Sequence, residues 1–413
     1  MKFFLVILSL FLSLQTELLE AKPFKKVLVL SGGSLNPGLA VGLIAGLKEK
    51  GWKPDLIIST CGANIGAAIN NSNPTIQGSF EVLRSWEFFK LFNQFQIETV
   101  NGIEIANKIS VAKNTFIYPD IFDHNLLFGP IEFKNILEKN EFNRDPKKEK
   151  LIMISARALF GPDKVGKQRE STPLFQQVYF TDPDTAEYLN NVKLPKKRSF
   201  PFTTLMSETQ AISSIDVMAA ARAGVADPYL MNPSIVDGYY QFTGAVDLFP
   251  LDLAESLGEE VIATYPGGLF LDYEDVAVNS AFGFKQTDRA LEAIQHKNLK
   301  WIDVSNSDSV SFNPTRLVVV MQSGIPTDFI KFKLGVAKQW NFGRERAIEA
   351  LRMAPGAQRD NRFHLRKPIN PKLIEKFSCE NAFEWKTDQR DFCVNDISPK
   401  CDRRIAKTCV PIR

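Results

Sequence analysis

The sequence has almost no excess of charge of either sign, and it contains only three histidines in 413 residues. Its 50 basic and 47 acidic residues leave a formal net charge of +3, so we expect no nucleic-acid partner. A short basic cluster at 196–198 is interpreted as a solvated loop. A Cys–His catalytic pair would need His124, His296 or His364 beside a cysteine, and the sequence places none of them there. Each is interpreted as an ordinary surface or core histidine.

Long hydrophobic runs are also scarce. One apolar run, Phe3 to Leu14, follows Lys2 near the start of the chain, and it is shorter than the roughly 20 residues that span a bilayer. A positive residue, a short apolar run and Ala21 before a cleavage point are typical of a secretory signal peptide over residues 1–21. We therefore expect an exported protein, in the periplasm, on the outer cell surface or secreted. An uncleaved N-terminal anchor is the alternative.

Cysteine is sparse and unevenly placed. Four of the five cysteines, Cys379, Cys393, Cys401 and Cys409, lie in the last segment. In an oxidising compartment they would form two disulfides, with three pairings that the sequence does not distinguish. Their spacing does not fit a paired Cys-x-x-Cys zinc site, so no metal site is predicted. Cys61 is left over.

What the sequence does contain is a regular alternation of apolar strands and helices. Short buried strands are predicted at 26–31, 56–58, 151–155, 261–264 and 316–321. Helices are predicted at 40–47, directly after residue 63, and at 75–95, 216–225, 250–257 and 286–297. Residues 161–200 carry glycine, proline and charge and are interpreted as a long excursion. Strands alternating with helices predict an α/β fold, in three layers around a mainly parallel sheet.

The domain organisation follows from these patterns. Residues 24–275 are predicted to form the α/β domain, and 276–355 further α/β elements that complete or cap it. Beyond about residue 355 the composition turns polar, and 356–413 is predicted to be a cysteine-bearing C-terminal extension.

One strand ends in a tight turn of small residues that opens a helix, at Ser59-Thr60-Cys61-Gly62-Ala63. Such a turn exposes one side chain beside the free N–H groups of a helix N-terminus, which suits a nucleophile and a developing oxyanion. The exposed side chain would be Cys61, and a helix N-terminus lowers the pKa of a thiol. The alternative is an ordinary core cysteine.

This arrangement resembles the patatin-like acyl hydrolases. That family has a Gly-Gly-Gly-x-Arg-Gly turn, a helix, a strand ending in Gly-x-Ser-x-Gly, and a later Asp-Gly-Gly or Asp-Gly-Ala before a proline and a helix. Its Ser and Asp form a catalytic dyad. The resemblance places Gly32, Gly33 and Ser34 in the oxyanion turn and Cys61 at the nucleophile position. A rival alignment places Asn64 there.

The chain departs from the family at each functional position. Ser34 replaces the third glycine, Asn36 the arginine, and Pro37 removes one backbone N–H from the turn. The sequence Thr243-Gly244-Ala245, before Pro250, resembles the motif of the dyad aspartate, so Thr243 occupies the aspartate position.

A threonine is no carboxylate base near neutral pH. Asp237 and Asp247 lie close in sequence and are the candidates for a substitute base, although each is more typical of a turn. Upstream, Ala223 to Pro228 resembles the small-residue loop of the family, which ends in proline.

Three functions remain open. The first is a patatin-like domain that has lost hydrolysis and binds lipid or acyl ligands or a membrane surface. The second is an active lipid acyl hydrolase with Cys61 as nucleophile. The third is an interaction protein that acts through its cysteine-bearing tail. No cofactor is expected, because Gly32 to Pro37 breaks the dinucleotide-binding spacing.

Overall fold

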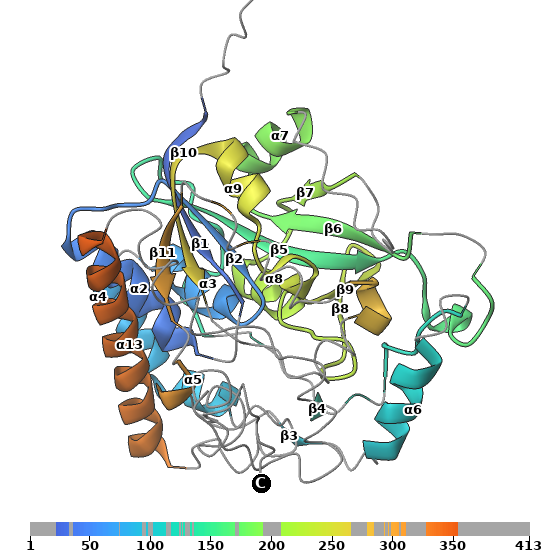
Figure 1. Ribbon diagram of the computed structural model, residues 1–413. Coiled ribbons are helices and arrows are strands. Elements are labelled where there is room, and N and C mark those ends of the chain that lie inside the picture. The colour runs from blue at the N-terminus through green and yellow to red at the C-terminus, as the bar shows by residue number, and fades with distance from the viewer. Residues whose placement is uncertain are drawn as a thin grey trace, which may run out of the picture.

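The structure is a computed structural model of the chain (Figure 1). It describes residues 22–32, 36–73, 75–92, 96–97, 102–112, 117–123, 125, 127–128, 133, 136–169, 173–192, 208–265, 279–284, 293, 296, 299–304, 307–310 and 328–353. The predicted signal peptide, the helix predicted at 286–297 (apart from residues 293 and 296), the strand predicted at 316–321 and the four C-terminal cysteines lie outside the described residues.

A nine-stranded sheet forms the centre of the molecule. Its main path runs in the order β11-β10-β1-β2-β5-β6-β7, and a hairpin of β8 and β9 joins it through β5. The strands are β1 (Phe24–Leu30), β2 (Leu56–Thr60), β5 (Lys150–Ala158), β6 (Phe175–Phe180), β7 (Gln210–Ile212), β8 (Ser234–Val236), β9 (Tyr239–Phe242), β10 (Gly258–Tyr265) and β11 (Lys300–Asp303). A separate antiparallel pair consists of β3 (Gln96–Ile97) and β4 (Leu127–Phe128).

Most pairs in this sheet are parallel. The pairs from β11 to β5 and the pair β6–β7 are parallel, whereas β5–β6, β5–β9 and β8–β9 are antiparallel. The prediction of an α/β fold with a mainly parallel sheet is therefore confirmed. The physical basis is the apolar runs at residues 27–30 in β1 and 56–58 in β2, which are buried on both faces of the sheet.

The register along β5 brings two strand ends together. Thr60, the last residue of β2, pairs with Ile154, and Phe242, the last residue of β9, pairs with Ala156 on the same strand. Because β2 runs parallel to β5 and β9 antiparallel to it, both strands point their carboxyl ends at Ser155. At about 3.3 Å per residue, the two ends are separated by roughly 7 Å. The turn after β2 and the turn after β9 therefore meet.

The described part of the chain forms nine α-helices around the sheet. They are α2 (Pro37–Glu49), α3 (Ala63–Ser72), α4 (Ile76–Leu83), α5 (Trp86–Phe92), α6 (Gly102–Ala112), α7 (Pro183–Asn191), α8 (Val217–Ala223), α9 (Leu251–Leu257) and α13 (Phe329–Arg352). Side chains of α2, α3, α8 and α13 belong to one hydrophobic cluster, and side chains of α7 and α9 belong to a second. Successive β1 residues alternate between them, as Leu28 faces the first cluster and Val29 the second.

Two stretches differ from their predictions. The predicted helix at 75–95 is two helices, α4 and α5, separated by Arg84 and Ser85. The predicted excursion at 161–200 is wrong in its middle part, because it contains the sheet strand β6 and helix α7. Asp182 caps α7 by accepting a hydrogen bond from the Thr185 N–H at 3.2 Å. The polar and glycine-bearing flanks concealed this short apolar strand. Among the described helices, none combines the length and the apolar character needed to cross a membrane.

Helix α13 lies directly against α2, although the two are far apart in sequence (Figure 1). Glycines on both helices permit this approach. A Cβ atom on Gly42 would lie 2.2 Å from the carbonyl oxygen of Trp340, and one on Gly343 would lie 2.4 Å from that of Leu39. Since the obstructing atoms are backbone, no side-chain rotation relieves the clash, and α13 fits only where α2 has no side chain.

This packing predicts the effect of one added methyl group. We expect Gly42→Ala to destabilise the protein by about 3 kcal/mol, because overpacking against backbone outweighs the helix propensity gained from alanine. Chemical denaturation measures the change. Ala45→Ser, at a half-buried position of the same helix, is the control and should change the midpoint little. A midpoint for Gly42→Ala at or above that of the parent would contradict the contact.

Candidate functional site

Cys61 occupies the turn between β2 and α3, and its backbone has a φ of +50°. Glycine adopts this left-handed conformation readily, whereas other residues, apart from asparagine and aspartate, seldom do. Such backbone strain persists where the surrounding structure imposes it, and it is typical of a nucleophile elbow. The side chain is half-buried and is a thiol. Cys61 therefore lies in the turn where the strand passes into the helix, and its role as a nucleophile stays a prediction.

Two glycines from other parts of the chain lie in close contact with this turn. A Cβ atom on Gly32, which follows β1, would lie 2.7 Å from the Cβ atom of Cys61. A Cβ atom on Gly244, which follows β9, would lie 2.8 Å from the backbone N of Cys61. The two glycines that the sequence analysis aligned with the motifs therefore meet at the elbow. Gly33 and Ser34, also predicted for the oxyanion turn, lie outside the described residues.

Asn64, the rival candidate for the nucleophile position, is fully buried in the first turn of α3. Its side-chain oxygen accepts a hydrogen bond from Ser59 Oγ at 2.7 Å, and its amide nitrogen donates to the Ile154 carbonyl at 3.4 Å. These bonds tie α3 to β2 and β5. Asn64 therefore positions the helix, and the side chain that the turn presents is that of Cys61.

Asp227 carries a carboxylate in contact with Cys61, as the partner in a catalytic dyad would be. It was not among the bases predicted from the sequence. The Cys61 thiol donates a hydrogen bond to Asp227 Oδ2, with 4.0 Å between sulfur and oxygen. Burial of the carboxyl group raises the pKa of Asp227 to about 6, and a hydrogen bond from Thr243 opposes this rise without cancelling it. A carboxyl group with this pKa is ionised at neutral pH yet is a stronger base than an ordinary aspartate.

Thr243 stands beside this carboxylate at the end of β9. Its hydroxyl group has one proton and two acceptors within reach: the Gly224 carbonyl at 3.3 Å and the Asp227 carboxylate, whose pKa this hydrogen bond lowers. Backbone bonds hold the two segments together, from Thr243 N–H to Ala226 O at 3.0 Å and from Gly244 N–H to Gly224 O at 2.9 Å. The residue at the predicted aspartate position therefore positions a carboxylate that a neighbouring loop supplies.

The predicted substitute bases have other surroundings. Asp237 (φ +50°) and Gly238 (φ +79°) form the two-residue turn between β8 and β9, and Asp237 accepts a hydrogen bond from Ser214 Oγ at 3.1 Å. Asp247 ends the short helix η2 (Gly244–Asp247) and is buried. The pKa of Tyr179 is raised first by burial and then by the charge of Asp247, which places Asp247 near that phenol. The carboxylate with a hydrogen bond to Cys61 described above is that of Asp227.

A signal for Asp227 was present in the sequence. The loop from Ala223 to Pro228 had been aligned with a small-residue loop, and Asp227 stands directly before its proline. Only its spatial contacts with Cys61 and Thr243 indicate a functional role for this aspartate. Neither contact follows from sequence spacing, because the three residues come from three separate turns.

The electrostatic setting of the elbow is mixed. The first turn of α3, from Ala63 to Gly66, is uncharged, so no side chain there opposes the positive end of the helix dipole beside Cys61, whereas Asp227 adds a negative charge 4.0 Å from the sulfur. The start of α2 offers less, because Pro37 has no N–H and the Gly38 N–H donates to Gln339 Oε1 at 3.2 Å. The N-terminus of α3 offers backbone N–H donors to an oxyanion.

Comparisons with known proteins show little likeness. No family model matches the chain. The urease accessory protein UreD of Aliarcobacter butzleri is 28% identical over 101 residues, which are 24% of this chain and 40% of that protein, so the chain spans less than half of this relative. Among solved structures, VipD from Legionella pneumophila has a TM-score of 0.33 at 12% identity, over 79% of this chain and 67% of that one. Likeness at these levels identifies no family.

Proposed function

We propose that the protein is a thiol-dependent acyl hydrolase or acyl transferase in which Cys61 is the nucleophile and Asp227 its base. The observation that carries this proposal is the 4.0 Å contact between the strained elbow thiol and a carboxylate whose pKa is raised to about 6. Carboxylates with perturbed pKa values are found mainly at functional sites, and this one lies beside a cysteine with a left-handed backbone. On this proposal the chain is a patatin-like protein whose Ser–Asp dyad is replaced by Cys–Asp.

The reaction follows from these positions. Asp227 takes the proton of the Cys61 thiol while the sulfur attacks the carbonyl carbon of an ester or thioester. The resulting oxyanion lies against N–H groups at the start of α3. Collapse of this intermediate expels the alcohol or thiol, which takes the proton back from Asp227, and leaves an acyl thioester on Cys61. Water, deprotonated by Asp227, releases the acid and restores the thiol.

A second candidate is an acyl-binding domain that has lost hydrolysis. Pro37 and the engaged N–H of Gly38 favour it, because they remove donors from the turn that would stabilise an oxyanion in the resembled family. Lipid or acyl chains and a membrane surface are the proposed ligands under both candidates. Export and a role for the four C-terminal cysteines remain predictions, since those segments lie outside the described residues.

Replacing the nucleophile tests the first candidate. We expect the purified chain, with reduced thiols, to hydrolyse short acyl esters or a labelled phospholipid, and Cys61→Ala to lower kcat/KM at least roughly a thousandfold. Cys61→Ser should keep a small part of the activity, because Asp227 can also activate a hydroxyl group. Activity that persists in Cys61→Ala would exclude the thiol. A parent without turnover that still binds acyl chains would support the second candidate.

Replacing the base should separate activity from stability. We expect Asp227→Asn to lower kcat by about 10²–10⁴-fold. A pKa of about 6 in the folded state is above the 3.9 typical of unfolded chains, so stability contributed by the protonated form is lost as pH rises between about 4 and 6. At pH 7 the asparagine variant should therefore be more stable, by on the order of 1 kcal/mol.

The matched control for this change is Asp237→Asn in the exposed turn between β8 and β9. Asparagine tolerates the left-handed backbone there, so both activity and unfolding midpoint should stay near those of the parent. A loss of activity in Asp237→Asn, with Asp227→Asn unaffected, would reverse the assignment of the base.

The hydrogen bond from Thr243 sets the pH range of the reaction. Because this bond lowers the pKa of Asp227, Thr243→Val should raise that pKa further. Activity requires the ionised carboxylate, so kcat/KM of the parent should rise through pH 6, and the midpoint in the variant should lie at higher pH. A pH–rate profile measures both midpoints. An unchanged or lower midpoint in the variant would show that Thr243 does not act on the base.

A further inference from the structure

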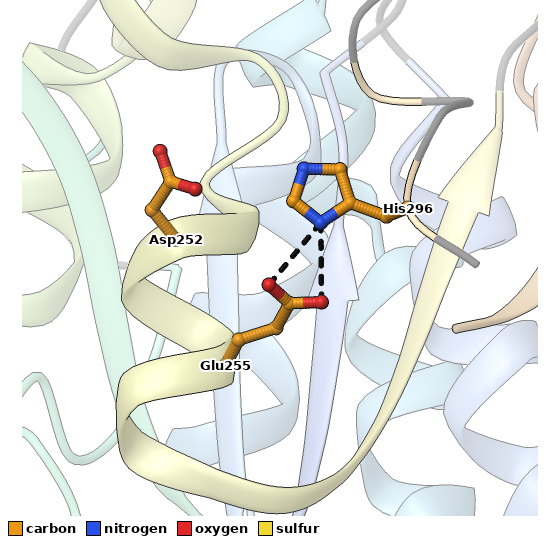
Figure 2. A group of neighbouring side chains, drawn as sticks. All are labelled: Asp252, Glu255 and His296. Atoms are coloured by element: carbon orange, nitrogen blue, oxygen red, sulfur yellow. Dashed lines mark hydrogen bonds and ion pairs between the residues drawn. The ribbon is translucent and has the colours of Figure 1, made fainter. Parts of the chain in front are cut away.

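A second group of ionisable side chains lies at helix α9, and it includes none of the residues of the elbow. Asp252 and Glu255 stand three residues apart and therefore on one face of the helix. His296, from a segment before β11, approaches the same face (Figure 2). All three side chains are partly buried. The cluster thus joins two parts of the chain that are separate in sequence.

The distances within this group are short. His296 Nδ1 lies 3.1 Å from both carboxylate oxygens of Glu255. One donor atom from each of the three residues can be chosen so that all lie within 4.8 Å of one another. A first-row metal ion with bonds of about 2.1 Å holds its ligand atoms roughly 3.4 Å apart. The 3.1 Å between His296 and Glu255 is close to this value, and the Asp252 oxygen lies within 4.8 Å of the other two donor atoms, so small rotations of the side chains would bring the three together.

The charges favour a cation at this place. Two carboxylates on one helix face repel each other. The helix dipole favours Asp252 in the first turn but opposes a negative charge at Glu255, near the other end of this seven-residue helix. A protonated His296 would balance one carboxylate, whereas a divalent ion balances both. The half-buried setting strengthens these interactions relative to fully exposed pairs, since water screens them less.

We propose that Asp252, Glu255 and His296 bind one divalent transition-metal ion. Two carboxylate oxygens with one imidazole nitrogen suit an ion of the zinc class, because imidazole selects against calcium and magnesium and the absence of sulfur in this set selects against soft monovalent copper. Three protein ligands leave a position for water or for a ligand atom. The ion would join α9 to the segment that carries His296, and it does not depend on Cys61.

Zinc binding by the full chain tests this proposal. The thiols are first blocked by alkylation, so that neither Cys61 nor the four C-terminal cysteines can bind the ion. After chelator treatment, titration calorimetry and elemental analysis should find one Zn²⁺ per chain, and the melting temperature should rise on zinc addition. Asp252→Asn, Glu255→Gln and His296→Gln should each weaken binding by roughly tenfold or more.

Glu259→Gln is the matched control, because Glu259 is an exposed carboxylate shortly after α9 and is not part of the cluster. Its zinc affinity should equal that of the parent. Circular dichroism of each apo variant checks that a loss of affinity is not a loss of fold, and three separate ligand variants make the test independent of any one of them. A parent that binds no zinc after alkylation, or folded ligand variants that bind as tightly as Glu259→Gln, would overturn the proposal.

Discussion

The meeting of two strand ends along β5 is the constraint on which the candidate site depends. β2 and β9 lie in line beside the same strand and point at each other across Ser155. Ser155 closes the junction by donating a hydrogen bond from Oγ to the Phe242 carbonyl at 2.7 Å. With so little space between the two turns, a Cβ atom on Gly244 would lie 2.5 Å from the Ile154 carbonyl oxygen and 2.8 Å from the Cys61 nitrogen. Gly32, which follows β1, makes a second close approach to Cys61, whose backbone is left-handed.

This junction also explains how a carboxylate reaches the thiol without an aspartate at position 243. The loop that follows α8 is bound to the end of β9 by backbone hydrogen bonds, so residues 227 and 243 lie side by side. A carboxyl group on either residue would lie close to the elbow. In the proposed dyad the loop supplies the base, and the threonine supplies a hydrogen bond that keeps the base ionised at a lower pH.

At the elbow, the features that favour the proposed catalysis lower the stability of the fold. A buried carboxyl group with a raised pKa and a left-handed cysteine both cost free energy of folding, and the surrounding packing has to offset them. The close contact of α2 with α13 and the two hydrophobic clusters on the faces of the sheet are the main sources of that stability. The proposed metal ion would add a link between α9 and His296, away from the strained turn at Cys61.

The sequence by itself determined the elements whose signal is local. The apolar runs of β1 and β2, the helices after them and the place of Cys61 in a tight turn follow from hydrophobic period and from small residues at a turn. It did not reveal β6 and α7, whose short apolar pattern lies between polar and glycine-bearing flanks. Only the folded arrangement brings Asp227 to the thiol and His296 to Asp252 and Glu255. The reason is that strand register and helix docking set these distances, and neither leaves a periodic trace in the sequence.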